Sequence, residues 1–225
     1  MKLLLWDIDG TLICSGRAGE HALIRAMKLE FGVDLTIDPR DLAGRTDTYF
    51  FGRSLKRHGL SDDLEAIHSL IDVYLTHLPE ELPKRPGKTL GGILPLLEQL
   101  ADREDIAQGL LTGNIEKGAQ LKLQHFDFWK FFPFGAFAND SHLRNELGPH
   151  AIRRASDFHQ FEFTPAHTFI IGDTPYDIEC GKVIGANTIA VATGAYSIEE
   201  LESHHPTAVF PDFNDPTSFL NLINN

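Results

Sequence analysis

The residues best suited to chemistry come directly after apolar stretches of the chain. Asp7 and Asp9 follow the first apolar run, in LLLWDIDGTL, and Asp173 and Asp177 follow another, in FIIGDTPYD. Thr112 ends a third run, in GLLTGN. Three apolar runs that all end in small or polar residues are hard to explain by turn chemistry alone. The pattern therefore indicates one shared site rather than unrelated turns.

If the four aspartates converge, their mutual repulsion has to be offset. Two carboxylates about 5 Å apart repel each other by roughly 3 kcal/mol at an effective dielectric near 20. An all-oxygen set of ligands suits Mg²⁺, and the sequence has no cluster of His or Cys that would favour zinc. In such a site the carboxylate of Asp7 can attack phosphorus, while Asp9 protonates the leaving oxygen and later activates water. Thr112, the N–H groups of Gly113 and Asn114, and the region of Gly10 are suited to bind phosphoryl oxygens.

Simpler structural roles are open for the same residues. Asp7 and Asp9 precede Gly10, and aspartate before glycine is common in turns. The two side chains share one face only if the chain stays extended, because a turn starting at Asp9 separates them. Asp173 also suits the N-cap of a helix that Pro175 opens.

Strands and helices alternate over most of the chain. Apolar runs predict strands at residues 3–6, 106–111, 134–138, 168–171, 188–191 and 208–210. Helical periodicity predicts helices at residues 20–31, 46–58, 62–78, 93–103, 115–125, 149–158 and 175–184. We therefore expect an α/β fold with a Rossmann-like parallel sheet, in which ligands bind at the carboxyl ends of the strands.

The early part of the chain interrupts this alternation. Between residues 14 and 82 the pattern is helical, with no buried strand, and residues 83–92 (PKRPGKTLGG) have the composition of a linker. We predict a core domain formed by residues 1–13 and 88–225, and an inserted all-helical cap domain formed by residues 14–87.

Composition restricts the partners. The chain has 225 residues and a formal net charge of −12, which argues against a broad nucleic-acid surface and means that an anionic substrate needs local cations. No apolar run approaches the roughly 20 residues of a membrane helix, so we expect no membrane partner. The two cysteines, Cys14 and Cys180, lack metal-ligand spacing and suggest a reducing compartment. We expect a cytoplasmic protein, monomeric or homodimeric.

The three motifs DIDGTL, LLTGN and GDTPYD, in this order and with an insert after the first, resemble those of the haloacid dehalogenase superfamily of aspartate-nucleophile phosphotransferases, and its phosphoglycolate phosphatase-like branch in particular. The resemblance implies a small phosphorylated metabolite as substrate, Asp7 as nucleophile and Asp9 as general acid and base that also gives the metal a backbone carbonyl. It further implies that Thr112 binds phosphate, that Asp173 and Asp177 hold Mg²⁺, and that the insert is a helical cap that excludes water.

One family motif is absent. The family places a lysine between its second and fourth motifs, whereas the corresponding stretch, DSHLRNELGPHAIRRA, has none. We expect Arg144 to replace it, because a guanidinium is always charged and can bind phosphate through two donors. In the insert, Arg45 of the loop GRTD is a candidate for binding a substrate carboxylate or second phosphate. The alternative is that Thr46 caps a helix and Arg45 is solvated.

The leading functional hypothesis is a Mg²⁺-dependent phosphatase acting on a small phosphomonoester. A phosphomutase of the beta-phosphoglucomutase type uses the same aspartates and is the main rival. A haloacid dehalogenase is less favoured, because its chemistry needs neither an acid at Asp9 nor a metal. A non-catalytic phosphate-binding protein is the alternative of a different class, since a fold does not determine function.

Overall fold

The computed structural model describes residues 1–224, and the side chains of all of these except residues 39 and 40. The fold is built on a six-stranded sheet of order β5-β4-β1-β6-β7-β8, in which each neighbouring pair of strands is parallel. The strands of this sheet are β1 (Lys2–Trp6), β4 (Ile106–Leu111), β5 (Gly135–Ala136), β6 (Thr168–Gly172), β7 (Asn187–Val191) and β8 (Ala208–Phe210). The expectation of an α/β fold with a parallel sheet is confirmed.

Helices cover both faces of this sheet, and a separate group of helices lies beside it. The helices around the sheet are α5 (Ile93–Ala101), α6 (Glu116–His125), α7 (Leu147–His159), α8 (Pro175–Ile184), α9 (Ile198–Glu202) and α10 (Thr217–Asn224). The separate group is α1 (Ala18–Phe31), α2 (Pro39–Leu42), α3 (Asp47–Arg57) and α4 (Leu64–Glu81). Short 3₁₀ turns occur at Leu82–Lys84, Trp129–Phe131, Arg144–Glu146 and Pro165–His167. The sequence patterns did not predict α2, α9 and α10, or the short strands β2 (Ile13–Cys14) and β3 (Lys88–Thr89).

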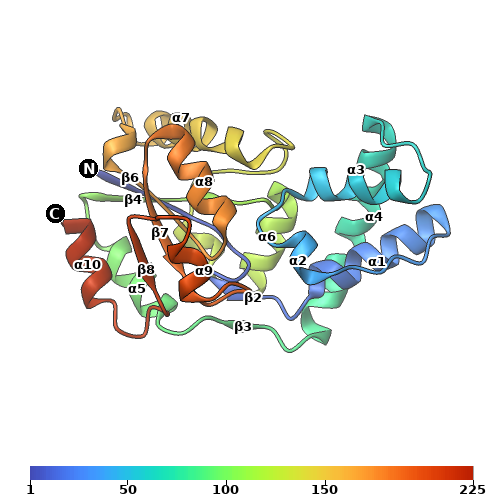
Figure 1. The fold of residues 1–225 in the computed structure, drawn as a ribbon, viewed down its shortest axis with the longest axis horizontal. Helices are drawn as coiled ribbons and strands as arrows, with labels where there is room; N and C mark the ends of the chain where they lie inside the picture. Colours follow the sequence, from blue (N-terminus) through green and yellow to red (C-terminus); the bar gives the residue numbers. More distant parts are fainter. Residues whose placement is uncertain (225) are drawn as a thin grey trace.

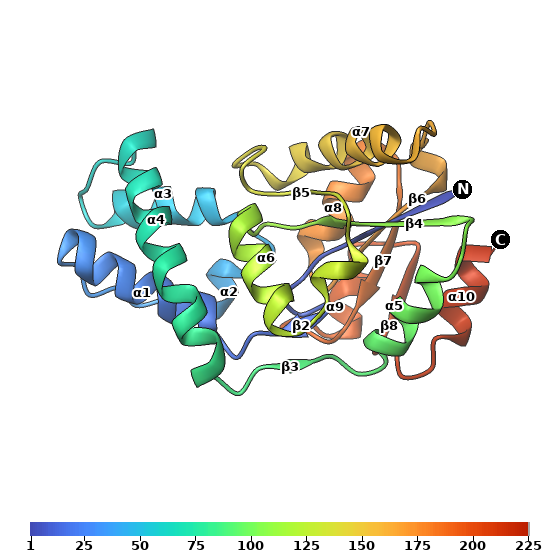
Figure 2. The ribbon, with the colours of Figure 1, turned by 180° about the vertical axis from the view of Figure 1, so that it is seen from behind.

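The central strand β1 sends alternate side chains to opposite faces of the sheet. Leu3 and Leu5 belong to the apolar cluster that α7 and α8 cover, whereas Leu4 and Trp6 belong to the cluster that α5 and α10 cover (Figures 1 and 2). All four side chains are fully buried. A strand buried on both faces has to be apolar at every position, which explains why this run shows no alternation.

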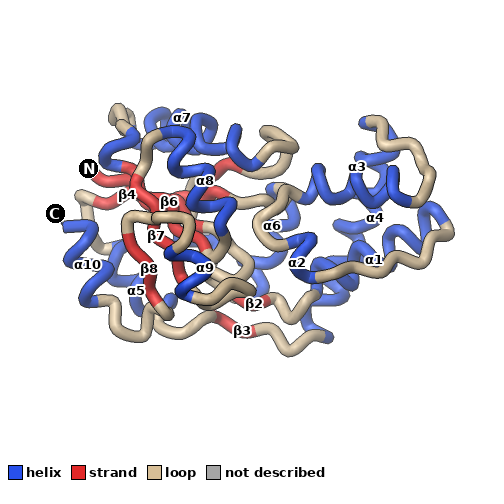
Figure 3. Tube along the Cα trace, viewed as in Figure 1, coloured by secondary structure: helices blue, strands red, loops and turns tan. Residues whose placement is uncertain are grey.

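The helices α1 to α4 have an apolar cluster of their own, to which Leu23, Phe51 and Tyr74 contribute. Figure 1 shows these helices to one side of the sheet. The chain enters the group through β2 (Ile13–Cys14) and leaves it through β3 (Lys88–Thr89), and these two short strands pair antiparallel. In Figure 3 they are the two red segments that lie side by side below the sheet. The entrance and exit of the helical segment are therefore adjacent.

The strand order places the predicted chemical groups together. β1 lies between β4 and β6, and all three strands run in the same direction. Their carboxyl ends therefore meet at one edge of the sheet, where ligands bind in open α/β folds. None of the helices that the structure describes is long and apolar enough to cross a membrane.

Candidate active site

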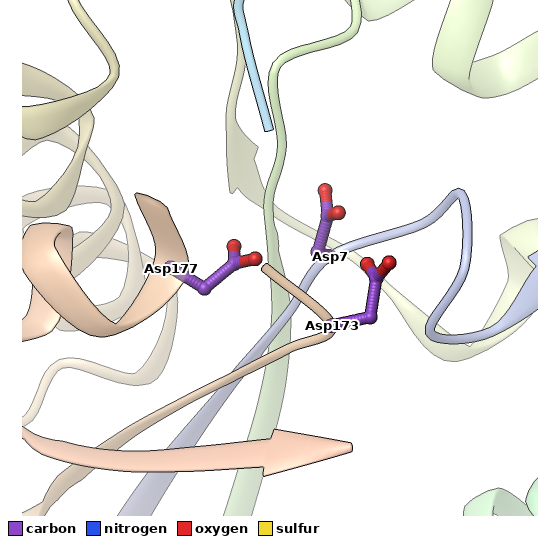
Figure 4. A group of neighbouring side chains, drawn as sticks. All are labelled: Asp7, Asp173 and Asp177. Carbon is purple, nitrogen blue, oxygen red and sulfur yellow. The ribbon is translucent and has the colours of Figure 1, made fainter. Parts of the chain in front are cut away.

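Three aspartates meet at this edge of the sheet. Asp7 follows β1, Asp173 follows β6, and Asp177 lies in the first turn of α8 (Figure 4). One carboxylate oxygen from each side chain lies within 4.8 Å of the other two. Each of the three residues is at most 5% exposed. The structure thus brings together three of the four aspartates that the sequence singled out.

The acidic cluster carries more negative charge than a buried site tolerates. Burial raises the pKa of Asp7 from its usual 3.8 to about 6, although the charge of Arg144 acts in the opposite direction. Burial also raises the pKa of Asp173 well above its usual value, and the carboxylates of Asp7 and Asp177 add to the effect. Both shifts report the cost of ionising neighbouring carboxylates in one place. The set of buried oxygens fits a divalent cation of the Mg²⁺ type, which binds oxygen ligands and offsets this charge.

Arg144 provides the positive charge that the protein itself supplies to the cluster. The residue is 7% exposed; its Nη2 lies 3.2 Å from Oδ1 of Asp7 and forms an ion pair with Asp177. Burial alone would lower the pKa of the guanidinium, but the two carboxylates outweigh it and raise the pKa. Nε of Arg144 is buried and has no hydrogen-bond partner among the described residues. The residue predicted for phosphate binding therefore keeps one buried donor that no described residue satisfies.

The N-cap of α8 is Thr174, so the alternative role of Asp173 as the cap is wrong. Asp177 completes a capping box, because its Oδ2 accepts hydrogen bonds from the backbone N–H of Thr174 at 3.0 Å and from its hydroxyl at 2.7 Å. These bonds fix the carboxylate of Asp177 at the start of the helix. Asp173 does not cap the helix and lies at the end of β6, where its Oδ1 accepts a hydrogen bond from the hydroxyl of Thr11 at 3.3 Å.

Asp9 has different partners from Asp7. β1 ends at Trp6, and Gly10 adopts a positive φ of 85°, so the chain turns and the two carboxylates separate. Oδ2 of Asp9 accepts a hydrogen bond from Nζ of Lys122 at 2.6 Å. Burial acts to raise the pKa of Asp9, but the charge and hydrogen bond of Lys122 outweigh it and lower the pKa. The Asp9 carboxylate is not part of the three-aspartate cluster found among the described residues.

The loop after β4 supplies polar groups next to both aspartates. Thr112 is fully buried, and its hydroxyl accepts a hydrogen bond from Nδ2 of Asn114 at 2.8 Å. The same amide donates to Oδ2 of Asp9 at 3.1 Å. Gly113 is tightly enclosed, since a Cβ there would lie 2.1 Å from the carbonyl oxygen of Arg45. Gly10 is enclosed in a similar way, with Asp173 Oδ2 only 2.3 Å from where a Cβ would lie.

Arg45 lies where the helical group meets the sheet. Its guanidinium carbon is 5.2 Å from the ring centre of Tyr49 in α3 and 4.5 Å from that of Tyr176 in α8. Thr46 is the N-cap of α3, as the alternative explanation supposed, and accepts a hydrogen bond from the backbone N–H of Tyr49 at 3.3 Å. Arg45 is nevertheless not simply solvated, because cation–π contacts with both tyrosines hold it.

A cavity of about 460 Å³ extends from the aspartates to the helical group. Both parts of the chain line it, the sheet side with Asp7, Asp9, Gly113, Asn114, Lys122, Arg144 and Asp173, and the helical side with Arg17, Glu20, Leu23, Arg45, Asp47, Phe51 and Tyr74. The volume is in the range of small-molecule sites. All the predicted site residues line the cavity except Thr112 and Asp177, which are buried behind it.

Four charged residues that line this cavity were not among the predicted site residues: Arg17, Glu20, Asp47 and Lys122. Lys122 shares the buried face of α6 with Gly118, Ala119 and Leu123, and this helical spacing in the sequence was a signal for an inward-facing lysine. Asp47 lies at the start of α3, where burial raises the pKa of its carboxyl group from 3.8 to about 6. Asp47 belongs to the loop GRTD that the sequence singled out, but aspartate is common at the start of helices, and only Arg45 of that loop was assigned to the site.

Comparisons with known proteins find similar hydrolases and phosphatases. A family model of HAD-hydrolase-like proteins matches residues 146–216. The chain is 24% identical over 225 residues to a putative pyrophosphatase, PpaX, of Clostridium perfringens, covering 99% of this chain and 97% of the relative. The fold is similar to a hydrolase from Pseudomonas syringae, with a TM-score of 0.75, 20% identity and 99% of both chains covered. It is also similar to CbbY from Rhodobacter sphaeroides in complex with phosphate, with a TM-score of 0.77, 17% identity and 96% of both chains covered.

Proposed function

We propose that the chain is a haloacid dehalogenase-like hydrolase, and specifically a Mg²⁺-dependent phosphatase that hydrolyses a small phosphomonoester through an aspartyl-phosphate on Asp7. One observation carries the proposal: the carboxylates of Asp7, Asp173 and Asp177 converge at a cavity that Asp7 and Asp173 line together with two buried cations, Arg144 and Lys122. Such a site combines a nucleophile, metal ligands and groups that attract phosphate.

In the proposed first step, a carboxylate oxygen of Asp7 attacks phosphorus and the bond from phosphorus to the ester oxygen breaks. Asp9 gives its proton to the leaving oxygen. Lys122 lowers the pKa of Asp9 in the free protein, but a bound phosphoryl dianion adds negative charge and raises it again. Arg144 and the loop Thr112–Asn114 bind the phosphoryl oxygens.

In the proposed second step, the Asp9 carboxylate takes a proton from a water molecule that attacks the phosphorus of the aspartyl-phosphate. Inorganic phosphate leaves, and the carboxylate of Asp7 is restored. Asp7, Asp173 and Asp177, with the backbone carbonyl of Asp9, would hold the Mg²⁺ ion. When bound, the ion supplies positive charge that offsets the carboxylates and polarises the phosphoryl group.

We also propose that residues 14–87 form a cap domain that closes over the cavity and excludes bulk water. The support is that α1, α3 and α4 contribute Glu20, Phe51 and Tyr74 to its lining. Adjacent entry and exit strands, β2 and β3, give this segment a single two-stranded connection to the sheet. A cytoplasmic location and a monomeric or homodimeric state remain predictions.

Pyrophosphate is a second candidate substrate, because the relative from Clostridium perfringens is named a putative pyrophosphatase. The helical side of the cavity favours a phosphomonoester instead. It presents the carboxylates of Glu20 and Asp47 and the apolar side chains of Phe51 and Tyr74. Arg17 is already paired with Glu20, with Nε 2.7 Å from Oε2. These groups suit an uncharged, partly apolar leaving group better than a second phosphoryl group.

The test is a screen of phosphate esters and pyrophosphate with MgCl₂, with inorganic phosphate as the readout. We expect release from a phosphomonoester, and we expect Asp7→Asn to lower it by roughly a thousandfold or more, because the nucleophile is lost while the shape is kept. A clear preference for pyrophosphate would select the second candidate. Conversion of a phosphorylated substrate into an isomer, without phosphate release, would show a phosphomutase and refute the proposal.

A further inference from the structure

Lys122 is a buried lysine whose partners all belong to the candidate active site. It lies on α6 and is 6% exposed. Nζ donates hydrogen bonds to Oδ2 of Asp9 and to Oδ1 of Asn114, both at 2.6 Å. A buried ammonium is costly unless it is paired in this way. These contacts connect the helix to the loops that follow β1 and β4.

The carboxylate of Asp9 is held from two sides. The hydroxyl of Ser15 donates to Oδ1 at 2.9 Å, while Lys122 and Asn114 donate to Oδ2. The side chain of Asp9 is 38% exposed, so it is not fixed by packing. Its orientation therefore depends on these hydrogen bonds, and Lys122 makes the charged and shortest one among them.

Lys122 also holds the residue that assists it. Asn114 donates through Nδ2 to Asp9 and to the Thr112 hydroxyl, and its Oδ1 accepts from Lys122. Without the ammonium, the amide of Asn114 loses the partner that fixes which way it points. The orientation of Asp9 would then rest mainly on Ser15.

We propose that Lys122 is a positioning residue that keeps the Asp9 carboxylate oriented for proton transfer at the substrate. This inference rests on the proposed function, in which Asp9 transfers protons. Such a transfer needs donor and acceptor atoms within about 2.6 to 3.2 Å, so a rotated carboxylate loses the reaction even when substrate is bound. Among the described residues Lys122 forms no ion pair with Asp7, and of the proposed phosphoryl ligands it bonds only to Asn114, so Arg144, Thr112 and Gly113 do not depend on it.

The experiment compares Lys122→Met with Lys117→Met in steady-state kinetics on the best phosphomonoester. Lys117 is an exposed lysine on the same helix, bonded to Gln120, and its variant should match the wild type. Lys122→Met should lower kcat by roughly 10- to 100-fold and change KM by less than about threefold, because geometry is lost but substrate binding is kept. Lys122→Ala should regain part of its kcat with added alkylammonium salts, which should not stimulate the wild type. Comparable kcat in Lys122→Met and wild type, or a loss confined to KM, would overturn the inference.

A crystal structure tests the positioning role of Lys122 independently of the proposed function. In a crystal structure of Lys122→Met, the Asp9 carboxylate should turn away from Asn114, with the rest of the site unchanged. An unchanged Asp9 side chain would contradict the positioning role whatever the enzyme does. A wild-type protein without activity on phosphate esters would instead refute the proposed function, and the orientation of Asp9 would still decide the role of Lys122.

Discussion

At the scale of single residues, the two buried cations Arg144 and Lys122 pair with different acidic groups. Arg144 pairs with Asp7 and Asp177, and Lys122 pairs with Asp9. Each cation therefore stabilises a different carboxylate of the proposed reaction, the nucleophile in one case and the proton carrier in the other. In the stretch where the related family has a lysine, this chain has Arg144, which pairs with Asp7. Lys122, from a different helix, pairs with Asp9.

Substitution of Arg144 should affect both activity and stability. We expect Arg144→Met to lower kcat/KM for a phosphomonoester by roughly 100-fold, because phosphoryl oxygens lose a charged donor. The metal-free variant should also be destabilised by about 3 to 5 kcal/mol, since the carboxylates lose their counterion. Enzyme kinetics and urea unfolding measure the two effects. Arg153→Met, at an exposed position on α7, is the control; equal activity in both variants would rule out the assigned role.

At the scale of elements, the start of α3 is attached to the loops of the active site. The hydroxyl of Thr46 donates to the carbonyl oxygen of His142 at 2.6 Å, and the N–H of Asp47 donates to that of Gly113 at 2.7 Å. In return, the N–H of Ile115 donates to Oδ2 of Asp47 at 2.9 Å. Helix α3 of the proposed cap is therefore hydrogen-bonded to the loop that carries Thr112 and Asn114. A movement of α3 should displace this loop.

Asp47 should give this contact a measurable pH dependence. Burial raises the pKa of its carboxyl group from 3.8 to about 6. Between these values the folded protein keeps a proton that the unfolded chain has released, so stability due to Asp47 falls as the pH rises through this window. Asparagine does not titrate. We therefore expect the Tm of Asp47→Asn, relative to wild type in EDTA, to rise across the window and level off above it. A difference that does not change with pH would contradict the assignment.

At the scale of the whole molecule, an excess of acidic residues surrounds a cluster of buried carboxylates. The formal net charge is −12, and the proposed substrate is an anion. The cavity offsets this charge locally with Lys122 and Arg144. The remaining repulsion within the three-aspartate cluster should make the fold depend on a bound cation at neutral pH.

Addition of MgCl₂ should stabilise the protein. At a concentration 100-fold above Kd, binding to the folded state alone adds about 2.7 kcal/mol and raises Tm. Asp173→Asn removes one carboxylate from the cluster, so the metal-free variant should be more stable than the metal-free wild type but should show little shift with Mg²⁺. Thermal unfolding with EDTA and with MgCl₂ measures both. An equal shift in the two proteins would place the bound ion elsewhere.

Much of this organisation can be predicted from the sequence alone. Uniformly apolar runs determined the strands of a parallel sheet, and the parallel direction places the loops after these strands at one edge. Asp7, Thr112 and Asp173 could therefore be assigned to one site without coordinates. The helices α2, α9 and α10 were missed because they are short, although Ser197 and Glu200 form a capping box at the start of α9 that the sequence displays.

Only the tertiary structure decided which charges pair. Helical periodicity shows that Lys122 faces inward, but not that the inward face of α6 meets the loop of Asp9. In the same way, the sequence placed Arg144 near a helix start without showing that Asp7 and Asp177 both pair with its Nη2. The reason is physical, because periodicity within an element determines only which side of that element is buried. The partner on that side is determined by how distant elements pack. The pKa of each carboxyl group depends on that partner.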